Sequence, residues 1–95
     1  MKEEVVMTRV ELFKQTLDAC KKLHREYVDL PPLESAETQL QYLIDIEEGK
    51  RQDRERLDKI ILGVIAVREI EDRDEQLASM IYKVEDEVEK MKAGK

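Results

Sequence analysis

The chain has 95 residues and a net charge of −6, and 42% of its residues are charged while 41% are hydrophobic. A chain of this length forms one domain, which buries roughly 65% of its unfolded surface. The acidic balance disfavours nucleic acids and anionic membranes as partners, because both require a cationic face, but it suits a basic protein partner. The single cysteine excludes a disulfide framework within the chain.

The sequence contains no targeting or membrane segment that we can recognise. Its first residues, Met-Lys-Glu-Glu-Val-Val-Met, lack the apolar run of a signal peptide, and no segment approaches the ~20 apolar residues of a membrane span. We therefore expect a cytoplasmic protein with one helical domain over residues 1–95. Residues 1–7 and 92–95 are expected to be flexible, and residues before Met7 are either an alternative start or an extension.

The first predicted helix covers residues 8–28. Thr8 and Glu11 have the spacing of a capping box, in which each side chain bonds the backbone amide of the other residue. The helix has an inward line with alternating steps of four and three, a spacing typical of helices that pack at shallow angles. This line consists of Val6, Val10, Phe13, Leu17, Cys20, His24 and Tyr27.

The second predicted helix covers residues 35–48. Pro31 and Pro32 are expected to end the first helix, because proline lacks an amide hydrogen and restricts the residue before it. The second helix should then begin near Ser35 and end at Gly49, since glycine often terminates helices. Its predicted inward residues are Ala36, Leu40, Leu43 and Ile44.

The third and fourth predicted helices cover residues 54–70 and 73–91. The run from Ile61 to Ile70 is apolar on nearly every side, so we expect the third helix to be central and the most buried. Gly63 costs a helix about 1 kcal/mol relative to alanine, which suggests that another backbone passes close to it. Asp72 and Glu75 predict a second capping box. An inward line follows at Leu77, Ile81, Val84, Val88 and Met91. The predicted fold is an all-α bundle of four helices.

Three sequence blocks carry a family resemblance. They are Ser-Ala-Glu-Thr-Gln-Leu-Gln-Tyr at 35–42, Leu-Gly-Val-Ile-Ala-Val-Arg-Glu at 62–69, and Asp-Glu-Gln-Leu at 74–77, with Gln76 inserted before the leucine. Together they resemble the bacterial type VI secretion immunity proteins that neutralise NAD(P)+ glycohydrolase toxins. The resemblance implies a cytosolic protein that binds a cognate toxin domain, blocks its active site and needs no cofactor.

Catalysis and metal binding find little support in the residues. Cys20 and His24 lie one helical turn apart and could in principle form a nucleophile and base, but no orienting group or oxyanion site is recognisable. The Glu-x-x-His motif of di-iron bundles is also absent, because Lys21 stands three residues before His24. We expect neither an enzyme nor a metal protein.

The predicted toxin interface has two parts. In the second helix, the core spacing turns Gln39, Tyr42 and Ile46 toward one outer face, and Gln41 and Asp45 flank it. Tyrosine is a favoured interface anchor. The alternative for Tyr42 is a ring that lies over the edge of the bundle. The second part is the polar turn after the third helix. It contains the carboxylates of Glu69, Glu71, Asp72 and Asp74.

A competing function is that of a structural or adaptor bundle that acts through homo-oligomerisation or as a chaperone-like module. The inward lines of the first and fourth helices could equally form a seam between subunits. The neighbouring gene discriminates between the two functions, because an immunity protein should follow a gene for a secreted toxin.

Overall fold

The computed structural model describes residues 7–94, so the predictions for residues 1–6 and 95, including Val6 in the first inward line, lie outside the described part. Within that part the chain is all-helical without a strand, as predicted. Four α-helices and two short helical segments follow one another along the chain. They are α1 (Arg9–Glu26), α2 (Pro31–Glu47), the 3-10 helix η1 (Glu55–Lys59), α3 (Leu62–Ile65), the π-helical η2 (Ala66–Ile70) and α4 (Glu75–Lys92).

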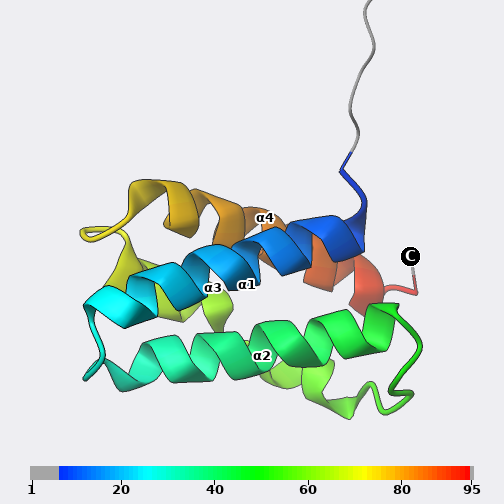
Figure 1. Cartoon of the computed structure of the whole chain (residues 1–95). Helices are drawn as coiled ribbons and strands as arrows, with labels where there is room; N and C mark the ends of the chain where they lie inside the picture. Colours follow the sequence, from blue (N-terminus) through cyan, green and yellow to red (C-terminus); the bar gives the residue numbers. More distant parts are fainter. Residues whose placement is uncertain (1–6, 95) are drawn as a thin grey trace, which may run out of the picture.

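The helices form two layers. Figure 1 shows α1 and α2 side by side and antiparallel at the front, with η1 and α3 behind them and α4 packed along α1. The shortest dimension of the described part is 20 Å, which matches two helices of about 10 Å diameter. The inward side chains of α1, α2 and α4 meet between these layers and form one core.

The start of α1 confirms the predicted capping box. The Thr8 hydroxyl accepts a hydrogen bond from the Glu11 amide at 3.2 Å, and the Thr8 amide donates to the Glu11 carboxylate at 2.9 Å. Two amides that the first turn would leave unpaired are thereby bonded. The helix begins at Arg9 and ends at Glu26, close to the predicted limits.

Helix α2 begins at Pro31, four residues before the predicted start at Ser35. The two prolines begin this helix because the first turn needs no amide hydrogen from them and their fixed φ angle is already helical. The predicted end at Gly49 is confirmed. Gly49 has φ 76°, its amide donates to Ile46, and the next amide, of Lys50, donates back to Asp45. This pair of bonds is a Schellman motif.

The prediction of one continuous helix over residues 54–70 is wrong. The 3-10 turn η1 ends before Ile60, whose backbone is extended, and the chain resumes as α3 and the π-helical η2. Leu57 and Leu62 are both buried, at 4% and 0% exposure. Five residues of continuous helix would place these two side chains about 140° apart, so the break allows both to reach the core.

The prediction that this segment is the most buried is also wrong. Ile65 is buried, but Ile61, Val64 and Val67 are 49%, 52% and 60% exposed. One side of α3 and η2 packs on the core while the opposite side remains apolar and open. The buried line of α4 is complete instead, with all five predicted residues at 1% exposure or less, namely Leu77, Ile81, Val84, Val88 and Met91.

Gly63 does not mark a close approach of two backbones. The atoms nearest to the position of an added Cβ belong to the Glu85 side chain, at 3.5 Å. The Gly63 amide donates to the Glu85 carboxylate at 2.7 Å, so this contact ties α3 to α4 through a side chain.

The cap of α4 lies two residues later than predicted. Asp74, not Asp72, is the N-cap residue, and its carboxylate accepts a hydrogen bond from the Leu77 amide at 3.0 Å. The π-helical η2 and the turn after it extend the connection beyond what the 72–75 spacing suggested. Helix α4 ends at Lys92, one residue past the predicted end.

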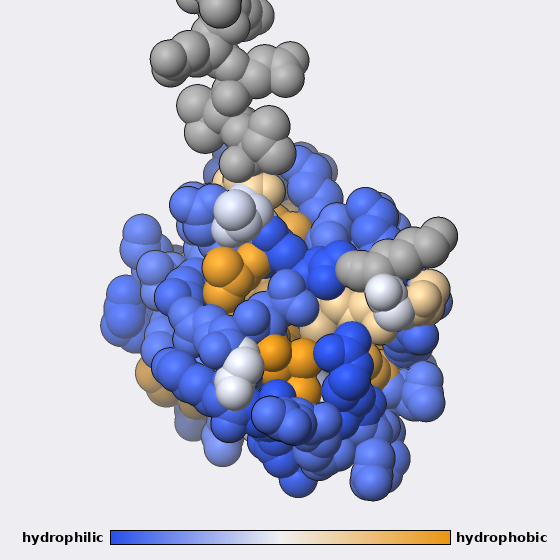
Figure 2. Space-filling model, turned by 90° about the vertical axis from the view of Figure 1, so that its right-hand side faces the viewer, coloured by the Kyte–Doolittle hydropathy of each residue, from blue (hydrophilic) through white to orange (hydrophobic). Residues whose placement is uncertain are grey.

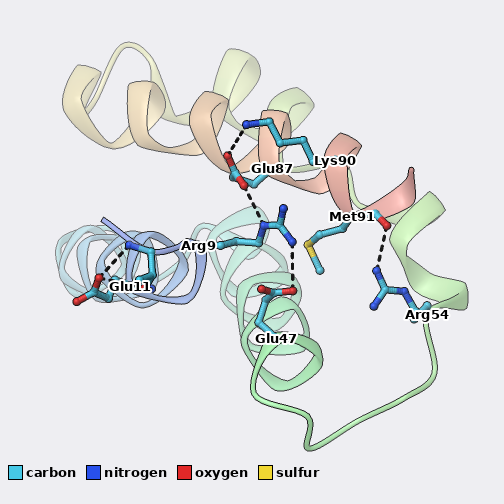
Figure 3. Close-up of polar contacts among 8 residues, drawn as sticks. Arg9, Glu11, Glu47, Arg54, Glu87, Lys90 and Met91 are labelled. Carbon is cyan, nitrogen blue, oxygen red and sulfur yellow. Dashed lines mark hydrogen bonds and ion pairs between the residues drawn. The ribbon is translucent and has the colours of Figure 1, made fainter. Parts of the chain in front are cut away.

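Charged contacts tie the helices together at one end of the molecule. Arg9 on α1 donates to Glu87 on α4 at 2.8 Å and to Glu47 on α2 at 3.4 Å (Figure 3). Arg54, just before η1, donates to the Met91 carbonyl at 3.0 Å. Seen from this end, hydrophilic side chains cover most of the surface and leave small apolar areas between them (Figure 2).

Candidate protein-binding surface

Tyr42 is a core residue and not the exposed anchor that the helix spacing predicted, and Ile46, predicted on the same outer face, is also buried. Its side chain is 4% exposed, and its hydroxyl donates to the Asp53 carbonyl at 2.8 Å. The Arg51 guanidinium lies 5.0 Å from the ring centroid. The chain that follows α2 therefore turns back and covers the ring, which explains why a position outside the regular inward line of α2 is buried.

Gln39 and Asp45 are half-buried on the same helix. The Gln39 carbonyl oxygen accepts a hydrogen bond from the Ile61 amide at 2.8 Å, and its amide group donates to the Ser35 hydroxyl at 3.0 Å. Asp45 accepts a hydrogen bond from the Gln41 side chain at 3.0 Å. Gln39 is thus used to hold the start of α3, whereas Asp45 keeps a charge near the surface.

The four predicted carboxylates of the polar turn have different surroundings. Glu71 accepts a hydrogen bond from the Tyr82 hydroxyl, and this bond raises the pKa of Tyr82. Glu69 lies 3.9 Å from the Arg73 guanidinium, and Asp74 caps α4. Asp72 is exposed. Three of the four carboxylates therefore help to shape the turn, and Asp72 projects into solvent.

The two halves of the predicted interface do not form one patch. The turn between η2 and α4 lies at the end of the molecule where α1 connects to α2, while Asp45 lies near the opposite end of α2 (Figure 1). Arg73 in the turn stacks 5.1 Å from the ring centroid of Tyr27, at the end of α1. Of the α2 residues, Gln39 contacts the segment that leads to the turn, through Ile61.

Sequence reasoning missed the surface that lies between Gln39 and the turn. The exposed side of α3 and η2 borders a surface hollow of about 700 Å³, whose other wall includes Tyr82, Glu85 and Asp86 of α4. Tyr82 also lines a second hollow with Glu71 and Asp72. The signal in the sequence was the three-residue spacing of Ile61, Val64 and Val67, which is one helix stripe and not an all-round apolar surface.

Cys20 and His24, the possible nucleophile and base, are not arranged for catalysis. Cys20 is fully buried, and burial raises the pKa of its thiol to about 12. Its sulfur lies 3.7 Å from the Leu33 carbonyl, while His24 faces Glu37 at 2.7 Å. A thiol this hard to ionise is a poor nucleophile. Residues 7–94 also contain no group of three or more His, Cys, Asp and Glu side chains that could hold a metal ion.

Most of this chain is similar to known proteins. Residues 8–90 match the Tsi6 family. This chain belongs to the Tsi6 family. It is also similar to a chain of the solved structure described as "Structure of Tse6 in complex with Tsi6", with a TM-score of 0.85 and 28% identity over 93% of this chain and 94% of that chain. No curated protein matches the chain significantly.

Membership of the Tsi6 family confirms the resemblance to type VI secretion immunity proteins that the three sequence blocks indicated. In the structure these blocks lie on α2, on α3 with η2, and at the start of α4. Gln39 links the first block to the start of the second, and Asp74 of the third caps α4. No helix of the described part has the length and apolar character needed to cross a membrane.

Proposed function

We propose that this chain is an immunity protein that binds a cognate toxin domain in the cytoplasm and blocks its active site. The observation that carries the proposal is its similarity, over nearly its full length, to a chain of the Tse6–Tsi6 complex. A small, pre-folded helical surface suits this role, because a rigid binder loses little conformational entropy when it associates. Blocking requires tight binding, since even a few free copies of a toxic enzyme turn over many substrate molecules.

The proposed target is a toxin that consumes NAD(P)+. This part of the proposal rests on the family resemblance of the three sequence blocks at 35–42, 62–69 and 74–77. The chain itself is proposed to be non-enzymatic, and the buried Cys20 thiol supports that view. It would act by occupying the cleft through which the dinucleotide enters.

The proposed contact surface keeps the polar turn with Glu69, Glu71, Asp72 and Asp74, and Gln39 on α2 borders the segment that leads to it. Asp45, near the other end of α2, is kept as a separate contact. Exposed carboxylates of the turn suit a basic partner, because charge complementarity speeds encounter. Tyr42 contributes indirectly. It holds the chain after α2 in place and is too buried to act as an anchor.

The adaptor alternative has less support than the immunity role. The predicted seam on α4 is buried inside the monomer, and on α1 the side chains of Phe13, Leu17 and Cys20 are buried as well. These buried residues hold the chain's own helices together, whereas Tyr27, predicted to lie on the same inward line of α1, is 40% exposed.

The experiment that tests the proposal is co-purification with the toxin domain encoded by the neighbouring gene, followed by an NAD+ consumption assay. We expect a 1:1 complex and complete loss of NAD+ hydrolysis at equimolar chain. Absence of a complex would refute the immunity role. A stable complex with a toxin that leaves NAD+ intact would refute the assignment to NAD(P)+ and retain the binding role.

A further inference from the structure

The exposed side of α3 and η2 is an apolar stripe formed by Ile61, Val64 and Val67. Each of these side chains is about half exposed, at 49%, 52% and 60%. Single exposed aliphatic residues are common, but three neighbours beside one hollow concentrate apolar surface at one place. The other large exposed apolar side chains of the described part are Met7, Tyr27 and Val28, and none of them lines this hollow.

The hollow beside the stripe has a fixed wall. Glu85 on α4 accepts a hydrogen bond from the Gly63 amide at 2.7 Å, and both residues line the hollow, so this bond holds its two sides together. Gly63 has no side chain to fill the space, and the first atoms that an added Cβ would meet are those of Glu85. The stripe and the hollow together form a groove between α3–η2 and α4. This groove is already formed in the free chain, which favours binding because little reorganisation is required.

The groove borders the most acidic part of the sequence. From Glu69 to Glu89 the chain has nine carboxylates and two cations, Arg73 and Lys83, which gives a net charge of −7. The rest of the chain therefore carries +1, given the total of −6. Asp86 lines the groove, and Tyr82 connects it to the hollow that contains Glu71 and Asp72. An apolar groove with an acidic rim results.

The groove could be covered by a second copy of this chain or by a basic partner protein, and the charge distribution favours the basic partner. In a symmetric dimer the same surface would meet itself, so a rim that carries Asp86 and the carboxylates of the turn would meet a rim of the same net charge. Arg68 is the one cation among the residues that line the groove. Like charges brought together at an interface cost free energy, whereas a basic partner would gain from the same rim.

We infer that this groove, with the stripe Ile61, Val64 and Val67 as its apolar contact and Asp86 on its rim, is where the toxin docks with an apolar side chain flanked by basic residues. The inference rests on the proposed function, because the toxin is the occupant. It moves the centre of the interface from the polar turn to the exposed side of α3 and η2, beside the hollow that α4 borders. The acidic turn then forms one end of this interface.

The test measures binding of the neighbouring toxin domain to the full chain by surface plasmon resonance. The double variant Val64→Ser/Val67→Ser removes apolar contact without changing charge. Since about half of each valine is free to be buried, we expect affinity to fall by about tenfold. The matched control is Val28→Ser, at 68% exposure on the α1–α2 connection, which should bind like wild type. Thermal melts of all variants verify that they are folded.

A second arm tests the rim. Asp86→Lys should slow association several-fold at low salt and have a smaller effect at high salt, because steering by surface charge is screened. Its matched control is Asp18→Lys on α1, an exposed carboxylate that is not part of the groove. Equal loss of association in both variants would mean that only net charge matters and would overturn the assignment of the rim.

The outcomes distinguish failure of the groove assignment from failure of the immunity role. If wild type binds the toxin and the folded double variant binds equally well, the docking surface is elsewhere and the immunity role stands. If wild type does not bind the toxin, the immunity role fails and the groove assignment falls with it. Sedimentation of the free chain should show a monomer. A dimer that Val64→Ser/Val67→Ser dissociates would identify a second copy as the occupant and overturn the inference.

Discussion

Tyr42 is held by its ring and by its hydroxyl, and the two contributions can be separated by substitution. Tyr42→Phe removes the hydrogen bond from the Tyr42 hydroxyl to the carbonyl of Asp53, which is an exposed residue. We expect this variant to lose about 1 kcal/mol of unfolding free energy. Tyr42→Ala also removes the packing of a ring that is 4% exposed, which should cost roughly 3–5 kcal/mol.

Chemical denaturation of these two variants checks the role of Tyr42. An interface anchor would show the opposite pattern, with weaker toxin binding and unchanged stability. If Tyr42→Ala unfolds at the same denaturant concentration as wild type, the ring is not part of the core.

Gly63 offers a second test at the scale of a single residue. An added Cβ would lie 3.5 Å from Glu85, an ordinary contact with a side chain, and the backbone of Gly63 is helical without a positive φ. Gly63→Ala should therefore leave the melting temperature unchanged or raise it, because alanine is the better helix former. A loss of more than about 1 kcal/mol in a thermal melt would show that a rigid neighbour occupies this space.

At the scale of the element, the end of α2 depends on the left-handed conformation of Gly49. A side chain at φ 76° is strained, although open space surrounds the position. Gly49→Ala should destabilise the protein by about 1 kcal/mol. Gly49→Asn is the matched control and should cost less, because asparagine tolerates this conformation better than alanine. Equal stability of wild type and Gly49→Ala in urea denaturation would contradict the Schellman ending.

Local and distant contacts explain which elements the sequence could predict. The Thr8–Glu11 box and the ending at Gly49 depend on neighbours within a few residues, so their sequence patterns were sufficient. The break at Ile60 and the burial of Tyr42 depend on contacts with residues of other segments, many positions away in the sequence. Examples are Gln39 with Ile61 and Tyr42 with Asp53, at separations of 22 and 11 residues. Periodicity alone carries no information on such contacts.

The same distinction applies to the candidate site at the scale of the whole molecule. The concentration of carboxylates in the turn was visible in the sequence, because charge is a property of composition. The groove beside it was not, since an apolar run can be buried on all sides or on one side only. The outward direction of Val64 and Val67 is fixed by the packing of the opposite stripe, Leu62, Ile65 and Ala66, onto the core.

The stability of the whole molecule should fall in acid, in part through the contact of Arg9 with Glu87. The hydrogen bond from the Arg9 guanidinium lowers the pKa of Glu87 below its usual value of 4.5. A carboxylate with a lowered pKa in the folded state stabilises the fold above its unfolded pKa and loses this contribution as pH falls through the folded value. Bonds from Lys14 lower the pKa of Glu48 in the same direction. Unfolding should therefore become easier below about pH 4.5.

Glu87→Gln isolates one part of this acid sensitivity. The variant cannot ionise at this position, so its unfolding midpoint in urea should change less between pH 6 and pH 3 than that of wild type. Asp86→Asn is the matched control, because Asp86 is adjacent, is exposed and makes no ion pair within residues 7–94. It should keep the wild-type pH profile. Arg9 also contacts Glu47 on α2, and this contact remains in the variant. Identical profiles for Glu87→Gln and wild type would therefore mean that the Arg9–Glu87 ion pair adds nothing to stability in water.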